Sequence, residues 1–178
     1  MVLYNGAAAG GAIAYFDYLK LFVTAAGTAG TSVRLNVVVE ALNRYSANGA
    51  DYSAKAGQAA GYTTPNPLVN SASVMSVIRI GGTCAATAAG ATARTLVNEV
   101  LRPVISVAGD QYIIKFGGVG EPGMGLNSIA IAGTAIAQAT YLVPPVMVPP
   151  GHSALVHIWQ PAQTAASSYE FELCWWER

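Results

Sequence analysis

The closing stretch Ser168-Tyr-Glu-Phe-Glu-Leu-Cys-Trp-Trp176 alternates between two sets of side chains. One parity holds Tyr169, Phe171, Leu173 and Trp175, and the other holds Glu170, Glu172, Cys174 and Trp176. Successive side chains of a β-strand point to opposite faces, so a period of two predicts a strand with one face in a core. This segment therefore favours a fold built from half-buried strands.

Residues 32–42 show the same alternation. The apolar parity holds Val33, Leu35, Val37, Val39 and Ala41, and the polar parity holds Arg34, Asn36 and Glu40. Residues 13–23, which precede them, are rich in Tyr and Phe and are joined to them by the small residues 24–31. The two segments predict a pair of antiparallel strands.

Short alternating runs recur along the rest of the chain. They predict strands at 74–80, 95–102, 111–116, 127–132, 139–148, 153–159 and 168–176. Connections rich in Gly, Ala, Ser, Thr, Asn and Pro separate them. About eight short strands with such connections predict an all-β fold, an antiparallel two-sheet β-sandwich of the jelly-roll type.

The predicted organisation is one jelly-roll domain at 13–178, preceded by an N-terminal arm at 1–12. The arm is small, uncharged and rich in Gly, a composition that is mobile alone and can lie along a partner. Two long connections, 47–73 and 81–93, interrupt the strands. Loops of this length are often functional or ordered by a partner, and disorder is the alternative.

Charge is scarce in this chain. Charged residues make up 10% of it, with nine Lys or Arg and nine Asp or Glu, whereas soluble domains average about 25%. This scarcity predicts that other protein covers part of the surface, as in an assembly subunit. A net charge of zero disfavours direct nucleic-acid binding. The run between Glu121 and Glu170 is free of charge, but prolines and amides interrupt it, so no membrane span is predicted.

Cys84 and Cys174 are too few for a disulfide framework, and we expect both to be reduced, small hydrophobic residues.

Several motifs resemble catalytic or ligand-binding sites, but each lacks a residue that such a site requires. Gly118, Gly120 and Gly123 match the dinucleotide-binding pattern, but no acidic residue between Glu121 and Glu170 is available for a ribose. Gly151-His152-Ser153 resembles a nucleophile elbow, but Leu155 stands where a glycine is needed. A Pro-Pro-Gly turn entering a strand is the better interpretation.

The remaining polar pairs have ordinary interpretations. His152 and His157 are five positions apart and would point to opposite faces of one strand, which disfavours a metal site. Glu170 and Glu172 could mimic a glycosidase pair, but they fit the polar side of a half-buried strand. We therefore expect no enzymatic activity, no metal and no cofactor.

The aromatic residues raise a sharper question. Trp176 falls on the parity of Glu170 and Glu172, which predicts that it lies partly outside the core. It could anchor a subunit interface, stack on a sugar or pack under a loop of its own chain. The scarcity of charge favours the interface.

The closing segment VPPGHSALVHIWQPAQTAASSYEFELCWWER, residues 148–178, resembles the end of small structural proteins of tailed bacteriophages. The most similar of these are jelly-roll capsid decoration, or cement, proteins. The resemblance covers this segment closely and the rest of the chain only in composition. It implies a non-enzymatic virion protein, a homotrimer on the outer surface of the capsid that contacts the major capsid protein and stabilises the mature head.

The composition of the arm and the surplus of aromatic side chains in one strand predict the assembly contacts. In the arm they are Tyr4 and Asn5. In the lateral interface they are Trp176 and the aromatic residues of one strand, Tyr15, Phe16, Tyr18 and Phe22. One alternative is a trimeric phage tail or receptor-binding module that recognises host glycan. Another is a small sandwich enzyme such as a cupin, for which two histidines are too few.

Overall fold

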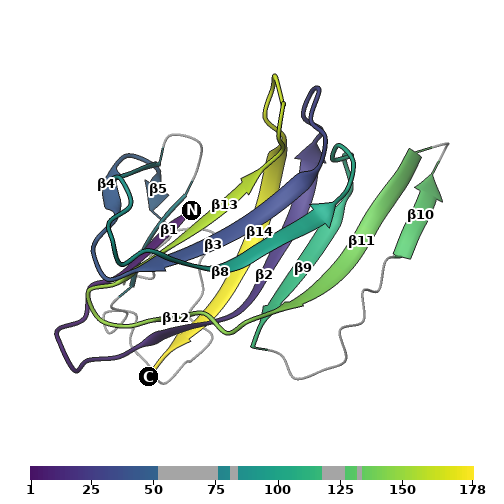
Figure 1. The fold of residues 1–178 in the computed structure, drawn as a ribbon. Helices are drawn as coiled ribbons and strands as arrows, with labels where there is room; N and C mark the ends of the chain where they lie inside the picture. Colours follow the sequence, from purple (N-terminus) through teal and green to yellow (C-terminus); the bar gives the residue numbers. More distant parts are fainter. Residues whose placement is uncertain (52–75, 81–83, 118–126, 132–133) are drawn as a thin grey trace.

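The computed structural model describes residues 1–51, 76–80, 84–117, 127–131 and 134–178 (Figure 1). All regular secondary structure among these residues is β-strand. This part of the chain therefore has no helix that could cross a membrane. The strands are β1 (Val2–Asn5), β2 (Ala14–Ala25), β3 (Val33–Glu40), β4 (Tyr45–Ala47), β5 (Ala50–Asp51), β6 (Ser76–Ile80), β7 (Ala85–Ala86), β8 (Arg94–Arg102), β9 (Gln111–Phe116), β10 (Asn127–Ile131), β11 (Thr134–Val143), β12 (Met147–Val148), β13 (Ser153–Trp159) and β14 (Ser168–Glu177). The predicted all-β class is confirmed.

The strands form two large sheets and one small ribbon. The first sheet has the order β5-β6-β1-β13-β3-β8. The second has the order β10-β11-β9-β2-β12, and β14 also pairs with β2. The ribbon consists of β4 and β7. In Figure 1, β13, β3 and β8 run across β14, β2 and β9.

One hydrophobic core joins the two large sheets. Leu35, Val37 and Val97 contribute from the first sheet and are almost fully buried. Leu21 and Ile114 contribute from the second sheet and are buried to the same degree. Side chains from both sheets belong to a single cluster, so the sheets face each other across one shared interior.

The predicted strand positions are largely confirmed. Those predicted at 111–116 and 153–159 are β9 and β13 with unchanged bounds. The strand predicted at 139–148 is divided, because β11 ends at Val143 and β12 begins at Met147. Pro144 and Pro145 lie between them, and proline has no backbone N–H to donate to a ladder.

Two predictions about pairing are wrong. β2 and β3 do not pair, because β2 lies in the second sheet and β3 in the first. The connection between them crosses from one sheet to the other instead of forming a hairpin. The sheets are also not purely antiparallel, since β9 and β11 run parallel.

The segment expected to be an arm contains β1. This strand pairs with β6 on one side and β13 on the other, and Leu3 is fully buried. The Met1 nitrogen donates to the Val156 carbonyl oxygen at 2.9 Å, and the Val156 N–H donates to the Met1 oxygen at 2.9 Å. Residues 2–5 are thus an inner strand of the first sheet, not a free arm.

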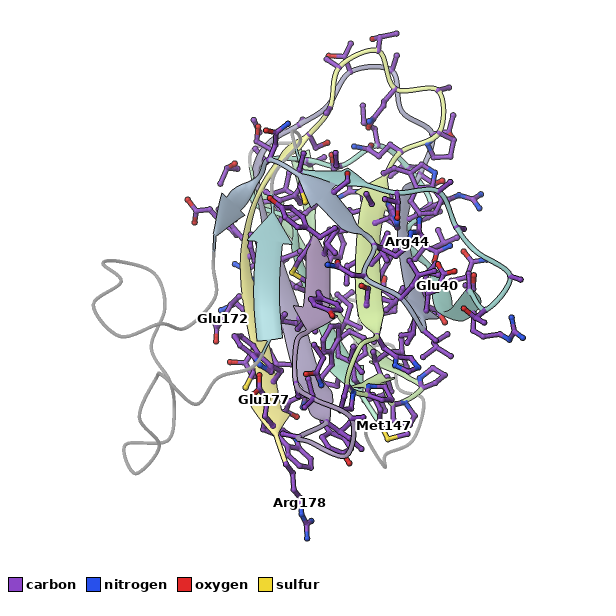
Figure 2. All side chains as sticks on the ribbon, turned by 90° about the vertical axis from the view of Figure 1, so that its left-hand side faces the viewer. Glu40, Arg44, Met147, Glu172, Glu177 and Arg178 are labelled. Carbon is purple, nitrogen blue, oxygen red and sulfur yellow. The ribbon has the colours of Figure 1, made fainter. Side chains whose placement is uncertain are left out.

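A buried ion pair ties the β4–β7 ribbon to the first sheet. Glu40 was expected on the solvent side of its strand, yet it is 1% exposed. Its carboxylate accepts from Arg44 Nη1 at 2.6 Å and from the Gly90 N–H at 2.6 Å (Figure 2). Arg44 Nε donates to the Thr87 oxygen at 2.7 Å, and the Arg44 N–H donates to Ser153 Oγ at 2.9 Å. The segments that flank the ribbon strands therefore cover Glu40.

Candidate interaction surface

The outer face of the second sheet carries large aromatic side chains from β2. Inward-facing Phe16 and Leu19 are buried, whereas Tyr15, Tyr18 and Phe22 are half-buried on the outer face. A β-bulge explains the irregular spacing of Tyr15 and Tyr18: Phe16 pairs with Trp175 and Tyr18 with Cys174, so Asp17 is an extra residue. The bulge places Tyr15, Tyr18 and Phe22 together on the outer face, opposite inward-facing Phe16.

Strand β14 has the two faces that its alternation predicts. Its inward-facing side chains pack against the core, and Trp175 is buried. Its outward parity places Glu170, Glu172, Cys174 and Trp176 beside the outer residues of β2. Trp176 is 47% exposed, which confirms that it lies partly outside the core.

An apolar cluster lies at one end of this face. Trp176 stacks on Tyr15 with ring centroids 4.1 Å apart and an interplanar angle of 10°. Met147 of β12 pairs with Tyr15 on its other side and is 49% exposed. We call Tyr15, Met147 and Trp176 the Trp176 cluster. Met147 was not among the predicted contacts, and its only signal in the sequence is its position between the Pro-Pro pairs at 144–145 and 149–150.

A shallow polar hollow of about 390 Å³ lies at the other end of the same face. Its walls include Phe22 and Gln111, with Lys20 directly across the ladder from Glu172. The Tyr18 hydroxyl donates to the Glu172 carboxylate, and this hydrogen bond raises the pKa of Tyr18 to about 12. The face is thus apolar at the Trp176 cluster and polar at the hollow.

The structure brings four of the predicted assembly residues together and separates three. Tyr15, Tyr18, Phe22 and Trp176 share the outer face of the second sheet. Phe16 points into the core, where its ring packs edge-on against Phe116 at 5.3 Å.

The other two predicted residues lie in the first sheet, on β1. Tyr4 is half-buried there. Asn5 is 1% exposed, and its Nδ2 donates to the oxygens of Ala12 and Val148, both at 2.8 Å. The hydrogen bonds of Asn5 therefore hold its own chain together.

The other sequence candidates occupy ordinary positions. His152 Nδ1 lies 3.0 Å from the Pro150 oxygen in the Pro-Pro-Gly turn, where Gly151 has a φ of 75°. Cys84 and Cys174 are both free thiols, and burial raises the pKa of Cys174. The Gly118–Gly123 motif and most of the 47–73 connection lie outside the described residues. Among the residues that are described, no three His, Cys, Asp or Glu side chains are grouped as metal ligands.

Comparisons with known proteins give no relative from which a role could be transferred. No protein-family model, no curated protein and no solved structure matches the chain.

Proposed function

We propose that this protein is a capsid decoration, or cement, protein: a non-enzymatic virion component that binds the outer surface of a phage capsid as a trimer. The observation that carries the proposal is the Trp176 cluster, a partly exposed apolar surface on the outer face of the second sheet. Solvent-exposed clusters of this kind mark protein contacts. The scarcity of charge and the resemblance of residues 148–178 support the same conclusion.

The jelly-roll relationship is part of this proposal. In a jelly roll the chain is wound so that early strands pair with late ones in nested order. Here β2 pairs with β14 and β3 pairs with β13, both antiparallel, which supports a roll. The parallel pairing of β9 with β11 departs from a simple roll and marks a variation in the second sheet.

The stabilising mechanism is mass action. A subunit that binds the expanded lattice, and not its precursor, lowers the free energy of the expanded lattice by an amount that grows with subunit concentration. Trimer formation would cover the outer face of the second sheet in a closed ring. The remaining exposed surface would then contact the major capsid protein.

Absolute mass is the first test. Light scattering over a concentration series should give three times the 18.3 kDa of the chain. The trimer should then sediment with expanded heads lacking their own decoration protein, and should raise the temperature at which those heads break. A monomer at every concentration would exclude the trimer, and a trimer that never sediments with heads would exclude the capsid role.

A further inference from the structure

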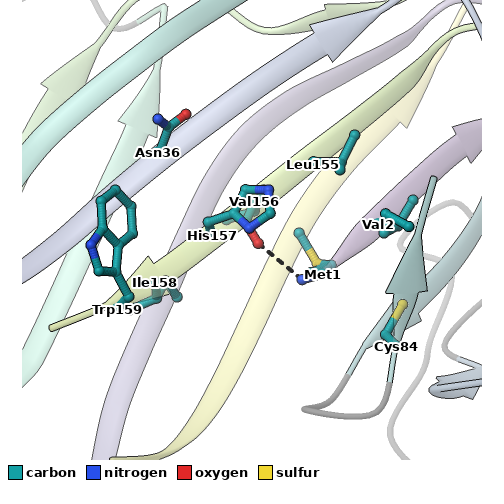
Figure 3. A pocket seen from close by; sticks show the side chains of 10 residues that line it. Met1, Val2, Asn36, Cys84, Leu155, Val156, His157, Ile158 and Trp159 are labelled. Atoms are coloured by element: carbon teal, nitrogen blue, oxygen red, sulfur yellow. Dashed lines mark hydrogen bonds between the residues drawn. The ribbon is translucent and has the colours of Figure 1, made fainter. Parts of the chain in front are cut away.

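A second hollow, of about 470 Å³, lies on the outer face of the first sheet, away from the Trp176 cluster (Figure 3). Its walls include His157 and Trp159 of β13 and Asn36 of β3. In Figure 3, Asn36 and Trp159 lie on one side of His157 and Cys84 lies on the other. Ligand pockets typically measure about 300–1,000 Å³, so this hollow is large enough for one or two sugar rings.

The strand register builds a row of neutral polar side chains across this face. His157 pairs with Asn36, and Asn36 pairs with Asn98 of β8. Trp159 stands two residues along β13, on the same face as His157. An indole is therefore set beside a line of imidazole and amide groups.

The side-chain oxygen of Asn36 is a hydrogen-bond acceptor in a buried position. This atom, Oδ1, has no hydrogen-bond partner among the residues that the structure describes. A buried acceptor without a donor destabilises a protein, and such groups in native structures call for an explanation. A ligand that donates a hydroxyl or amide hydrogen to this oxygen supplies one.

Among the described residues that line the hollow there is no Lys, Arg, Asp or Glu, and the Met1 ammonium group in the lining donates to the Val156 oxygen at 2.9 Å. Burial, and to a smaller degree the charge of the Met1 ammonium group, lowers the pKa of His157, which favours the neutral imidazole. The Met1 ammonium is already hydrogen-bonded to Val156 and no cationic side chain belongs to this described lining, which disfavours phosphate and carboxylate ligands such as nucleotides. The lining instead suits an uncharged ligand with an apolar face and several hydroxyl groups.

We infer that this hollow binds an uncharged sugar ring. The apolar face of the ring would stack on Trp159, and one hydroxyl would donate to Asn36 Oδ1. His157 would supply a second hydrogen bond. The inference does not rest on the proposed function, since a head-surface protein and a tail protein could both carry such a site.

The test uses the full chain labelled with 5-fluorotryptophan. Its three tryptophans give three fluorine resonances, which Trp159→Phe and Trp176→Phe variants assign. The probes are glucose, galactose, mannose and N-acetylglucosamine, with their common disaccharides. We expect at least one probe to shift the Trp159 resonance saturably while the other two resonances stay in place. No movement at millimolar concentrations of every probe would overturn the inference.

Asn36→Val gives a second readout that a purely structural role would not produce. Binding should weaken about tenfold because the acceptor is lost. Melting of the free protein should rise by about 2–4 °C, because the buried oxygen without a partner is removed. Val104→Ala, at an exposed position in the connection between β8 and β9, should leave sugar binding unchanged. An Asn36→Val protein that binds normally or melts lower would contradict the site.

Discussion

Trp176 lies flat against Tyr15 of the neighbouring strand, with ring centroids 4.1 Å apart. Stacked aromatic pairs contribute about 0.5–1.5 kcal/mol beyond the area that they bury. The indole is nevertheless 47% exposed, so the stack fixes its orientation without covering it. A side chain held in this way loses little rotamer entropy when a partner covers it, which is the property of an interface anchor.

Trp176→Ala should weaken self-association by about fivefold to thirtyfold, because an anchor residue contributes roughly 1–2 kcal/mol. Sedimentation equilibrium would measure the change. Val104→Ala is the matched control, since Val104 is 51% exposed in the connection between β8 and β9. Equal dissociation constants for the wild type and both variants would place the interface elsewhere.

Glu40→Gln should lower the free energy of unfolding by about 3–5 kcal/mol, because it leaves the buried Arg44 guanidinium without its anionic partner. Urea titration would measure the loss. Asp17→Asn, at the exposed bulge position of β2, is the control and should change stability by less than about 0.5 kcal/mol. A small effect at Glu40 would mean that water reaches the pair.

Alkaline pH should destabilise the protein through Tyr112. Burial raises the pKa of Tyr112, and its hydroxyl donates to buried Asp110 at 3.0 Å. Because the folded pKa is above the unfolded value of 10.0, this contribution is complete below pH 10 and is lost as the pH rises further. Urea midpoints at increasing pH should therefore fall above pH 10, and less steeply in Tyr112→Phe. Parallel slopes for the two proteins would refute this assignment.

Gly117→Ala should cost more stability than Gly151→Ala, although both glycines have positive φ, at 70° and 75°. Each substitution carries the backbone penalty of about 1–2 kcal/mol. A Cβ at Gly117 would also lie 3.0 Å from the Pro145 Cβ, whereas nothing lies within 4 Å at Gly151. Thermal melts of the two variants would show the difference, and equal losses would mean that the Pro145 ring moves aside.

The sequence predicts elements best where one face of a strand is buried and the other is solvated. In β14 the parities of Phe171 and Glu172 give both the strand and its inward face. Strand β1 could not be predicted from alternation, because Val2–Asn5 is too short to show a period and precedes a Gly-rich and Ala-rich stretch. Its partners, β6 and β13, are distant in the chain, so only the tertiary fold selects it.

The sequence indicated that aromatic residues of β2 form part of an exposed surface, but not which of them share a face. Aromatic residues on both faces of β2 indicated an exposed set, and Tyr15, Tyr18 and Phe22 belong to it. The bulge at Asp17 decides that Tyr15 and Tyr18 share a face, and a bulge leaves no mark in a simple period. The burial of Glu40 could not be predicted for a related reason, because Arg44 and Gly90, which bond its carboxylate, lie outside its own strand.

The pairing of β1 with β13 and of β2 with β14 has a consequence for synthesis on the ribosome. The backbone partners Met1 and Val156 are 155 positions apart. At about 5–20 residues per second, β1 emerges roughly 8–30 s before its partner exists. The early strands are therefore translated with unsatisfied edges, and the nascent chain completes its fold only after the closing strands leave the exit tunnel. A stalled or truncated translation product would expose those edges to aggregation and to chaperones.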